Sequence, residues 1–292
     1  MTPPPDDAAA PSDVDPAVSP PGLGPAVPPS GLDPAGTPLD AALTEGPLDV
    51  VGRIRAASNA TFLARLVDVS VVYKPVAGEK PLWDFPDGTL AGREVAAYLV
   101  SEVFGGGVVP RTWLRDGPLG PGMVQLWQDV DAAQSPVDVV PTDEVPPDGV
   151  RTVLEGVDED DRPVSVVHED SPALRRMAVL DAVVNNADRK GGHVLPLADG
   201  RRLGVDHGVT FHVEPKLRTV LWGWLGEPFA DDELAGVERV RAGLDGDLAH
   251  RLRGLLAPDE VAALAERCDR LLRTARFPAP EGDMPAVPWP LF

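Results

Sequence analysis

The sequence predicts an α+β protein with two lobes, the first built mainly from antiparallel strands and the second mainly from helices. Alternating runs rich in β-branched residues are concentrated between residues 48 and 130, and runs with helical spacing dominate between residues 174 and 274. One helical run, 93–104, falls among the strands. The chain has 292 residues, of which 43% are hydrophobic, so it can bury a sizeable core.

Composition divides the chain into four segments. Residues 1–46 are rich in Pro, Ala and Gly and hold seven acidic but no basic residues, which predicts a disordered acidic tail. Residues 47–130 are expected to form the first lobe and residues 131–276 the second, with an acidic, Pro-rich connection over 131–170. Residues 277–292 are a Pro-rich C-terminal tail, for which an extended strap and a free end are both open.

Charge and cysteine content limit the classes of partner. The net charge is −20, and the segment after residue 46 is itself acidic, so its field repels nucleic acid and anionic membrane surfaces. There is no basic and apolar leader and no apolar run of membrane-spanning length, so we expect a cytoplasmic protein without stable membrane association. The single cysteine, Cys268, lies in a helical pattern and is expected to be a buried structural thiol.

The first lobe is expected to contain five strands. The first two runs are separated by a small polar tip, 56–59, which is typical of a hairpin. A loop rich in turn residues, 81–92, precedes the helical run. The expected strands are 48–55, 61–67, 69–75, 108–114 and 122–130.

Two charged residues of this lobe lie in patterns that are otherwise apolar. Lys74 follows Val71-Val72-Tyr73, whose side chains mark a buried strand, so its ammonium needs an anionic partner or ligand. The alternative is an edge lysine that extends to water. Glu94, near the start of the helical run, either pairs with a cation or is a favourable charge at a helix N-terminus.

The second lobe is expected to contain an amphipathic helix, a short hairpin and three further helices. The connection before it has few periodic segments, with one expected helix near 149–154. The hairpin consists of strands 194–196 and 202–205 around Asp199-Gly200. The expected helices are 174–185, 231–242, 244–256 and 258–274.

Carboxylates, a cation and an imidazole follow these elements on two short loops. Asp188 and Arg189 come directly after the helix that ends near Asn185, and His193 lies five residues after Asp188. Asp206 follows the second strand of the hairpin. A reactive Asp and a metal-binding Asp in this order are parts of a phosphoryl-transfer centre, which also needs an upstream lysine.

The chain resembles the phosphatidylinositol 3/4-kinase superfamily, and within it the type II phosphatidylinositol 4-kinases and the bacterial HipA-like kinases. The resemblance lies in the order of four features: a lysine on a strand, a glutamate on a helix, an Asn-x-Asp-Arg motif and an Asp-x-Gly motif. Tyr73-Lys74-Pro75 is similar to their Phe-Lys-Pro. Asp206-His207-Gly208-Val209-Thr210-Phe211-His212, followed by Trp222-Gly223-Trp224-Leu225, is similar to the lipid kinases' Asp-Asn-Gly-x-x-Phe-Pro and later Trp-x-Trp-Leu. The resemblance covers about residues 48–275. The chain also resembles an actinobacterial family with this kinase-like domain, typically encoded beside a phosphomutase-like protein.

The resemblance implies a two-lobed protein-kinase-like fold that binds ATP together with Mg²⁺ or Mn²⁺. Lys74 would contact the α- and β-phosphates with Glu94 bracing it, as in other kinases. The turn at Ser58 and Asn59 would cover the phosphates with backbone N–H groups. The adenine would meet backbone groups of a hinge at Gln125, Leu126, Trp127 and Gln128.

The resemblance also implies roles on the two loops. Asp188 would orient or deprotonate the accepting hydroxyl, and Arg189 would stabilise either the catalytic loop or the transferring phosphoryl group. Asp206 would hold the metal ion. Trp222 and Trp224 are expected to be core aromatics, with substrate stacking as the alternative.

Three positions depart from the family pattern. His193 stands where the related kinases have a metal-binding Asn, and its softer nitrogen suits manganese or zinc better than magnesium. In the alternative, His193 only hydrogen-bonds the loop. Lys190 replaces a common His and either contacts substrate or phosphate or is a solvated loop residue. His207 replaces Asn or Phe and is expected to be structural.

Three classes of function follow. The first is an ATP-dependent kinase whose acceptor is a protein hydroxyl or a small polyol such as an inositol derivative; a lipid acceptor is disfavoured because the chain lacks a cysteine-rich insert and a membrane-binding patch. The second is a nucleotide-binding pseudokinase with a regulatory role. The third is a metal-dependent hydrolase built on Asp188, His193, Asp206 and His207, which leaves Lys74 and Glu94 without a role.

Overall fold

The structure is a computed structural model that describes residues 12–14, 43–54, 59–80, 82, 84–85, 90–282 and 284–292. The chain forms two compact units. The first unit comprises residues 1–80 and 113–129, and the second comprises residues 81–112 and 130–292. Most of the expected acidic tail, and Ser58 of the expected phosphate-binding turn, lie outside the described residues.

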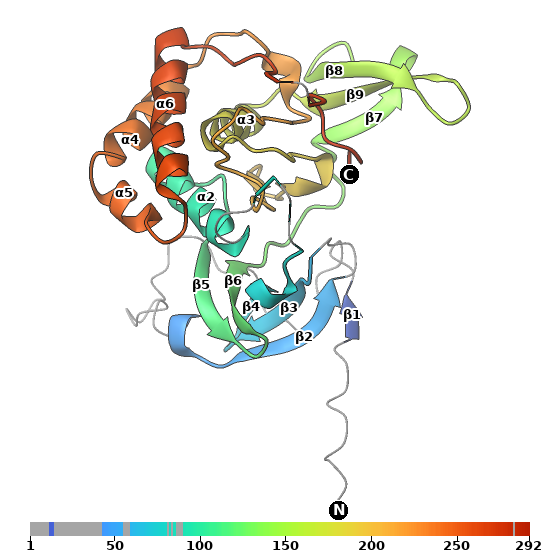
Figure 1. Cartoon of the computed structure of the whole chain (residues 1–292). Helices are drawn as coiled ribbons and strands as arrows, with labels where there is room; N and C mark the ends of the chain where they lie inside the picture. Colours follow the sequence, from blue (N-terminus) through green and yellow to red (C-terminus); the bar gives the residue numbers. More distant parts are fainter. Residues whose placement is uncertain are drawn as a thin grey trace, which may run out of the picture. The chain divides into compact units, whose positions relative to one another are not determined.

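The first unit is built on one six-stranded sheet (Figure 1). The order of the strands is β1-β2-β3-β4-β6-β5, in which β1 pairs parallel to β2 and the pairs β2–β3, β3–β4 and β4–β6 are antiparallel. A register shift interrupts the β2–β3 pairing between Val50 and Gly52. The strands are β1 (Ser12–Val14), β2 (Leu48–Ile54), β3 (Phe62–Leu66), β4 (Val69–Pro75), β5 (Thr112–Gly117) and β6 (Gly120–Leu126).

The two faces of this sheet carry different apolar clusters, because successive side chains of a strand point to opposite faces. The larger cluster includes Val71 and Tyr73 of β4 and extends to Leu43, which is buried. Arg115 donates to the carbonyl groups of Leu43 and Gly46, so residues just before β2 are also packed. The smaller cluster consists of Ile54, Leu63 and Trp127, with Val72 packed against it.

The second unit contains the long helices of the described residues. Helix α2 (Leu90–Phe104) packs against α4 (Asp231–Gly243), α5 (Asp247–Leu252) and α3 (Pro172–Val184), and α6 (Pro258–Thr274) packs against α3 and α4. The sequence grouped α2 with the strands of the first lobe, whereas residues 81–112 cluster with this helical unit. The expected α+β class, with a strand-rich part and a helix-rich part, is confirmed.

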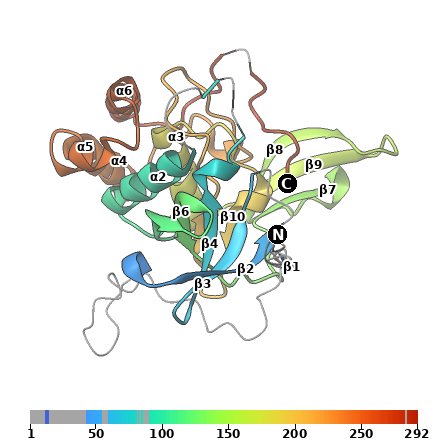
Figure 2. The ribbon, with the colours of Figure 1, turned by 60° about the horizontal axis from the view of Figure 1, so that its bottom comes forward.

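Residues 137–169 form a three-stranded antiparallel sheet, which corrects the expected connection. Its order is β7-β9-β8, from strands β7 (Val137–Pro141), β8 (Val150–Val157) and β9 (Pro163–Glu169). The helix expected near 149–154 is wrong, because Val150-Arg151-Thr152-Val153-Leu154 is a β-branched run that pairs with β9. The helices and this sheet lie at opposite sides of the second unit in both views (Figure 1, Figure 2).

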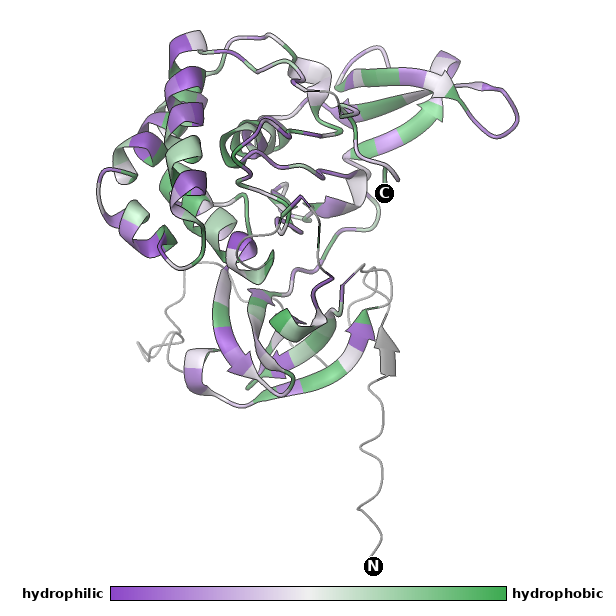
Figure 3. Ribbon diagram, in the orientation of Figure 1, coloured by the Kyte–Doolittle hydropathy of each residue, from purple (hydrophilic) through white to green (hydrophobic). Residues whose placement is uncertain are grey.

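The remaining elements of the second unit lie close to the bounds that the sequence predicts. Strands β10 (Val194–Pro196) and β11 (Arg202–Gly204) form the expected antiparallel hairpin. The expected helix 244–256 is shorter, since only α5 is helical there. Cys268 of α6 is fully buried, and this burial raises the pKa of its thiol to about 12. Polar and apolar residues alternate along α6, whereas the loop between β8 and β9 is hydrophilic (Figure 3).

None of the helices in the described ranges is both long and apolar enough to span a bilayer.

Candidate active site

The loop that carries Asp188 begins with a sharp change of chain direction at the end of α3. Asn185, the C-cap residue, adopts a left-handed conformation with φ of 55°. Its amide donates to the carbonyl groups of His212 (2.9 Å) and Glu214 (2.7 Å), and its side-chain oxygen accepts from the backbone N–H of Lys216 (2.9 Å). These bonds fasten the end of α3 to the segment that follows Asp206, so the two loops are tied together.

Arg189 of this loop forms a buried ion pair with Asp181 of α3. Nε and Nη2 of Arg189 donate to the two carboxylate oxygens, each over 2.8 Å, and the amide of Asn186 donates to the same carboxylate. All three side chains are buried. A buried charge is tolerated when it is paired and its hydrogen-bonding capacity is used, and both conditions hold here.

Arg189 also connects four segments of the second unit. Its Nη1 donates to the carbonyl groups of His193 (3.0 Å) and Val205 (3.1 Å), and its Nη2 lies 2.8 Å from Nε2 of His207. The guanidinium has no exposed surface. Arg189 therefore stabilises the loop, and His207 is part of the same buried cluster, as the sequence led us to expect for a structural residue.

Asp188 is held by its backbone while its carboxylate remains accessible. Its N–H donates to the side-chain oxygen of Asn186 over 3.0 Å. The carboxylate is 28% exposed and lies 3.2 Å from the ammonium of Lys190. Lys190 is thus paired with Asp188 in this structure.

His193 faces Asp206 across the two loops. Nδ1 of His193 lies 2.8 Å from the carbonyl oxygen of Asp188, and since a carbonyl only accepts, Nδ1 carries the proton. Burial lowers the pKa of His193, which favours the neutral ring. Its Nε2 therefore presents a lone pair, 3.4 Å from Oδ2 of Asp206.

The pair fits a divalent metal ion. A nitrogen and a carboxylate oxygen at this separation can bind one ion together, and the hydrogen bond to the other ring nitrogen fixes the tautomer as in protein metal sites. Within the described ranges, no group of three or more His, Cys, Asp and Glu side chains is placed to hold a metal. The remaining ligands would come from water and phosphate oxygens, which is usual for Mg²⁺.

Two neighbouring charged residues of α2 hold the loop that follows Asp206. The carboxylate of Glu94 accepts from the backbone N–H of His207 over 2.9 Å. Arg93 donates to the carbonyl of Thr210 over 2.7 Å and pairs with Glu260 of α6. The sequence pointed to Glu94 but missed Arg93, although a buried charge inside an apolar helical run is a signal that could have identified it.

The other sequence-predicted site residues lie in the first unit. Lys74 is half-buried on β4, opposite Met123 of β6, and alternation places it on the same face as Val72 and its apolar cluster. The Asn59 side chain accepts from the backbone N–H of Lys80 over 3.0 Å.

The expected hinge residues also belong to the first unit, at the place where the chain passes to the second. Gln125 and Leu126 are buried on β6. The N–H of Trp127 donates to the carbonyl of Ser70 (3.1 Å), and the carbonyl of Leu126 accepts from the Gln128 side chain (3.2 Å). These two backbone groups therefore have partners inside the unit.

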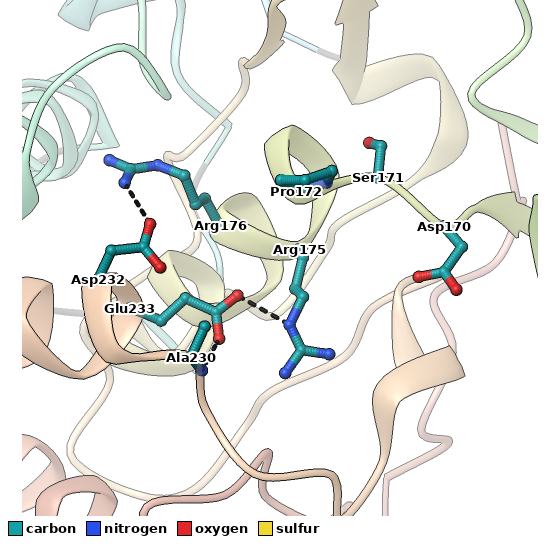
Figure 4. Close-up of a pocket in the computed structure, with 8 residues that line it drawn as sticks. All are labelled: Asp170, Ser171, Pro172, Arg175, Arg176, Ala230, Asp232 and Glu233. Carbon is teal, nitrogen blue, oxygen red and sulfur yellow. Dashed lines mark hydrogen bonds and ion pairs between the residues drawn. The ribbon is translucent and has the colours of Figure 1, made fainter.

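A separate cavity of about 410 Å³ lies at the N-terminus of α3, the end opposite to Asn185. Arg175 and Arg176 line it, paired with Glu233 (2.9 Å) and Asp232 (3.3 Å) of α4 (Figure 4). Arg175 also pairs with Glu227. Its arginines are matched by carboxylates, so the cavity is not set up to receive an anion.

The Trp222-Gly223-Trp224 segment forms core structure. Trp224 is fully buried, packs against His168 with 4.3 Å between the centroids of the tilted rings, and donates from Nε1 to Asp170 over 2.8 Å. Trp222 is partly buried and donates to the carbonyl of Ala286. These contacts account for both aromatic residues without a substrate.

The fold and the two loops define an α+β protein with a candidate metal-dependent centre, and comparisons with known proteins place it in a family. No protein-family model matches the chain. It is 50% identical over 269 residues to Protein Rv2133c of Mycobacterium tuberculosis (strain ATCC 25618 / H37Rv), covering 86% of this chain and 95% of the relative. The chain belongs to the same family as that protein.

Among solved structures, the chain is similar to the crystal structure of a Helicobacter pylori proinflammatory kinase, CtkA. The TM-score is 0.43 and the sequence identity is 13%, over 80% of this chain and 94% of that chain.

Proposed function

We propose that the protein is an ATP-dependent phosphotransferase of the phosphatidylinositol 3/4-kinase-like type, which transfers a phosphoryl group to an alcohol. The observation that carries this proposal is the cluster of Asp188, His193 and Asp206 on two loops. Arg189 joins these loops by donating to a backbone carbonyl of each. A rigidly held carboxylate beside a candidate metal pair is what phosphoryl transfer needs from a protein, since most of its catalysis is positioning and charge stabilisation.

Asp188 is assigned the acceptor side of the reaction. Its accessible carboxylate would accept the proton of the attacking hydroxyl, whose oxygen forms a bond to the γ-phosphorus while the bond to the β-phosphate oxygen breaks and ADP leaves. Lys190, 3.2 Å from Asp188, is placed to stabilise negative charge on the transferring group. Arg189 has a supporting role, because its buried guanidinium cannot reach a substrate.

His193 and Asp206 are assigned the metal ion, Mg²⁺ or Mn²⁺. When bound, the ion would neutralise charge on the phosphate oxygens of the nucleotide. With one imidazole nitrogen in the set, we expect manganese to support activity at least as well as magnesium. Glu94 holds the backbone directly after Asp206 and so helps to set the direction of its side chain.

The nucleotide is assigned to the face of the first unit that carries Lys74. Lys74 would meet the phosphates, with the turn at Ser58 and Asn59 covering them. The cluster of Ile54, Leu63, Val72 and Trp127 on the same face offers an apolar surface for the adenine. Gln125 and Leu126 of β6 would lie beside the adenine, where the Leu126 carbonyl would have to exchange the Gln128 side chain for the nucleotide.

Two alternatives have different support. A regulatory pseudokinase is favoured by His193, which stands where the resembled kinases have a metal-binding Asn. The Nδ1 atom of His193 donates a hydrogen bond to the backbone of its own loop and so is not available as a metal ligand. A metal-dependent hydrolase that uses His207 is disfavoured, because that ring is buried against Arg189. For the acceptor we propose a protein hydroxyl or a small polyol, since the net charge of −20 opposes nucleic acid.

The test is ATP binding and ATP turnover with Mg²⁺ and with Mn²⁺, on the wild-type chain, on Asp188→Asn and on Asp199→Asn. Asp199 pairs only locally with Arg201 in the exposed turn between β10 and β11 and serves as the matched control. We expect all three proteins to bind ATP and only Asp188→Asn to lose turnover, by about 10²-fold or more. If the wild type binds ATP without turnover, the pseudokinase is favoured. If it does not bind ATP with either metal, the kinase and the pseudokinase are both refuted.

A further inference from the structure

The C-terminal segment Pro285–Phe292, here called the strap, lies directly on the loop between Lys190 and His193. The N–H of Gly191 donates to the carbonyl of Leu291 over 2.8 Å. The ring of Phe292 packs so closely on Gly191 that a Cβ atom at this position would overlap it. Gly191 is therefore a site of close approach, where a larger residue would displace the strap.

A second line of contacts ties the strap to the same loop through residues 218–222. The carbonyl of Ala286 accepts from the N–H of Thr219 (3.0 Å) and from Nε1 of Trp222 (2.9 Å), and the carbonyl of Pro285 accepts from Arg218 (2.9 Å). Arg189 in turn exchanges two backbone hydrogen bonds with Arg218 and Val220. The strap thus holds the catalytic loop from two sides.

The composition of the strap suits this mode of binding. Pro285, Pro288 and Pro290 have no N–H to donate, so at these positions the backbone of the strap offers only carbonyl groups to its neighbours. Each of the hydrogen bonds described above with Gly191, Arg218, Thr219 and Trp222 uses a strap carbonyl as the acceptor.

We propose that the strap is a positioning element for the catalytic loop, attached at Gly191 by the ring of Phe292, which is 54% exposed, and by the carbonyl of Leu291. By fixing Gly191, it sets the residues on either side: Lys190, which pairs with Asp188, and His193, which faces Asp206. This inference rests on the proposed phosphotransferase function for its catalytic consequence. The order of the loop itself is a property that can be measured without any activity.

The experiment compares the full chain with Phe292→Ala, Phe292→Leu, Gly191→Ala and the double variant Gly191→Ala/Phe292→Ala. Met284→Ala, an exposed residue just before the strap, is the control. The readouts are hydrogen–deuterium exchange of residues 189–193, and kcat and KM for ATP turnover.

We expect Phe292→Ala to raise exchange in the loop at least fivefold and to lower kcat about tenfold with KM for ATP within twofold of wild type, and Phe292→Leu to restore most of both. Gly191→Ala should raise exchange and lower kcat as much as Phe292→Ala does. It should add little in the double variant, because its Cβ overlaps only the ring that Phe292→Ala removes.

Unchanged exchange in Phe292→Ala would overturn the inference whatever the activity. Faster exchange with unchanged or higher kcat would overturn the positioning role. A wild-type chain that neither binds nor turns over ATP refutes instead the proposed function and the catalytic role of the strap, while exchange still decides whether the strap orders the loop.

Discussion

Asp181 and Arg189 form a fully buried, two-point ion pair in which Nε and Nη2 of the arginine each lie 2.8 Å from a carboxylate oxygen. The pair joins the last turn of α3 to the loop that follows it. Since Arg189 also donates to the carbonyl groups of His193 and Val205, the charge of Asp181 indirectly supports both loops of the candidate active site.

Asp181→Asn removes this charge but keeps the shape of the side chain. Arg189 would then remain as a buried cation without its anion, so we expect a loss of about 3–5 kcal/mol in the free energy of unfolding. Urea denaturation measures it. Asp245→Asn is the control, because the exposed Arg241–Asp245 pair should contribute less than about 1 kcal/mol. Equal effects of the two substitutions would show that the Asp181–Arg189 pair does not hold the loop.

Gly223→Ala tests the packing around His168. The new Cβ would overlap both Nε2 of His168 and Cβ of Arg151, and His168 is fully buried with the tilted ring of Trp224 packed against it. Overpacking of this kind costs about 1–3 kcal/mol of stability. Gly156→Ala in β8 is the matched control, since a Cβ there meets no atom within 4 Å. A midpoint of thermal unfolding that is lowered equally by both substitutions would contradict the packing argument.

His168 should also make stability depend on pH. Burial is the main cause that lowers the pKa of His168, and its Nε2 accepts from the N–H of Gly223 while Nδ1 donates to the carbonyl of Glu169. Burial therefore makes the folded state prefer the neutral ring, although the hydrogen bond to the Glu169 carbonyl and the Asp170 carboxylate raise the pKa of His168 and Arg151 lowers it further. The stability from neutral His168 is fully present above the unfolded pKa of about 6.5 and is lost as the pH falls through the lower folded pKa.

The expected loss is up to about 1.4 kcal/mol for each pH unit below about 6.5. The measurement is the free energy of unfolding at pH 7.5 and pH 5.5 for wild type and His168→Gln, whose amide can donate and accept but does not titrate. The variant should lose less stability on acidification. His193 and His212, whose pKa values are also lowered, remain in both proteins and supply the common part of the slope. Identical slopes would exclude His168 as a source.

Local patterns predicted the elements that are defined by local chemistry. Val69–Pro75, Val194–Pro196 and Pro258–Thr274 have the predicted bounds, because alternation, turn residues or a Pro at the first helical turn mark them. Strand β8 was missed because the density of Pro and Asp around it outweighed its β-branched run. That run becomes a strand through its pairing with β9, a contact that no local pattern shows.

In the candidate site too, local patterns predicted some residues, whereas contacts between distant segments could not be predicted. The spacing of Asp188 and His193 after a helix, and of Asp206 after a hairpin, was enough to expect them together. Asp181 could have been suspected, since a carboxylate within the apolar run of α3 needs a buried partner. The strap meets Gly191 through the ring of Phe292 and the backbone carbonyl of Leu291, residues about a hundred positions further along the chain, so neither residue type nor spacing predicts the contact.

His193→Asn tests the candidate metal pair most directly. Asn restores the amide oxygen found at this position in the resembled kinases, and oxygen is the ligand that magnesium prefers. We expect the ratio of ATP turnover with Mg²⁺ to that with Mn²⁺ to rise about tenfold.

The hydrogen bond from His193 to the Asp188 carbonyl would be lost or altered, so total activity can fall. The ratio is the informative quantity, because general damage to the loop lowers turnover with both metals alike. His212→Asn, a substitution of the same kind at a ring that accepts from the N–H of Glu214, should leave the ratio unchanged. An unchanged ratio in His193→Asn would show that Nε2 of His193 is not a metal ligand, and would leave Asp206 as the only metal-binding side chain of the pair.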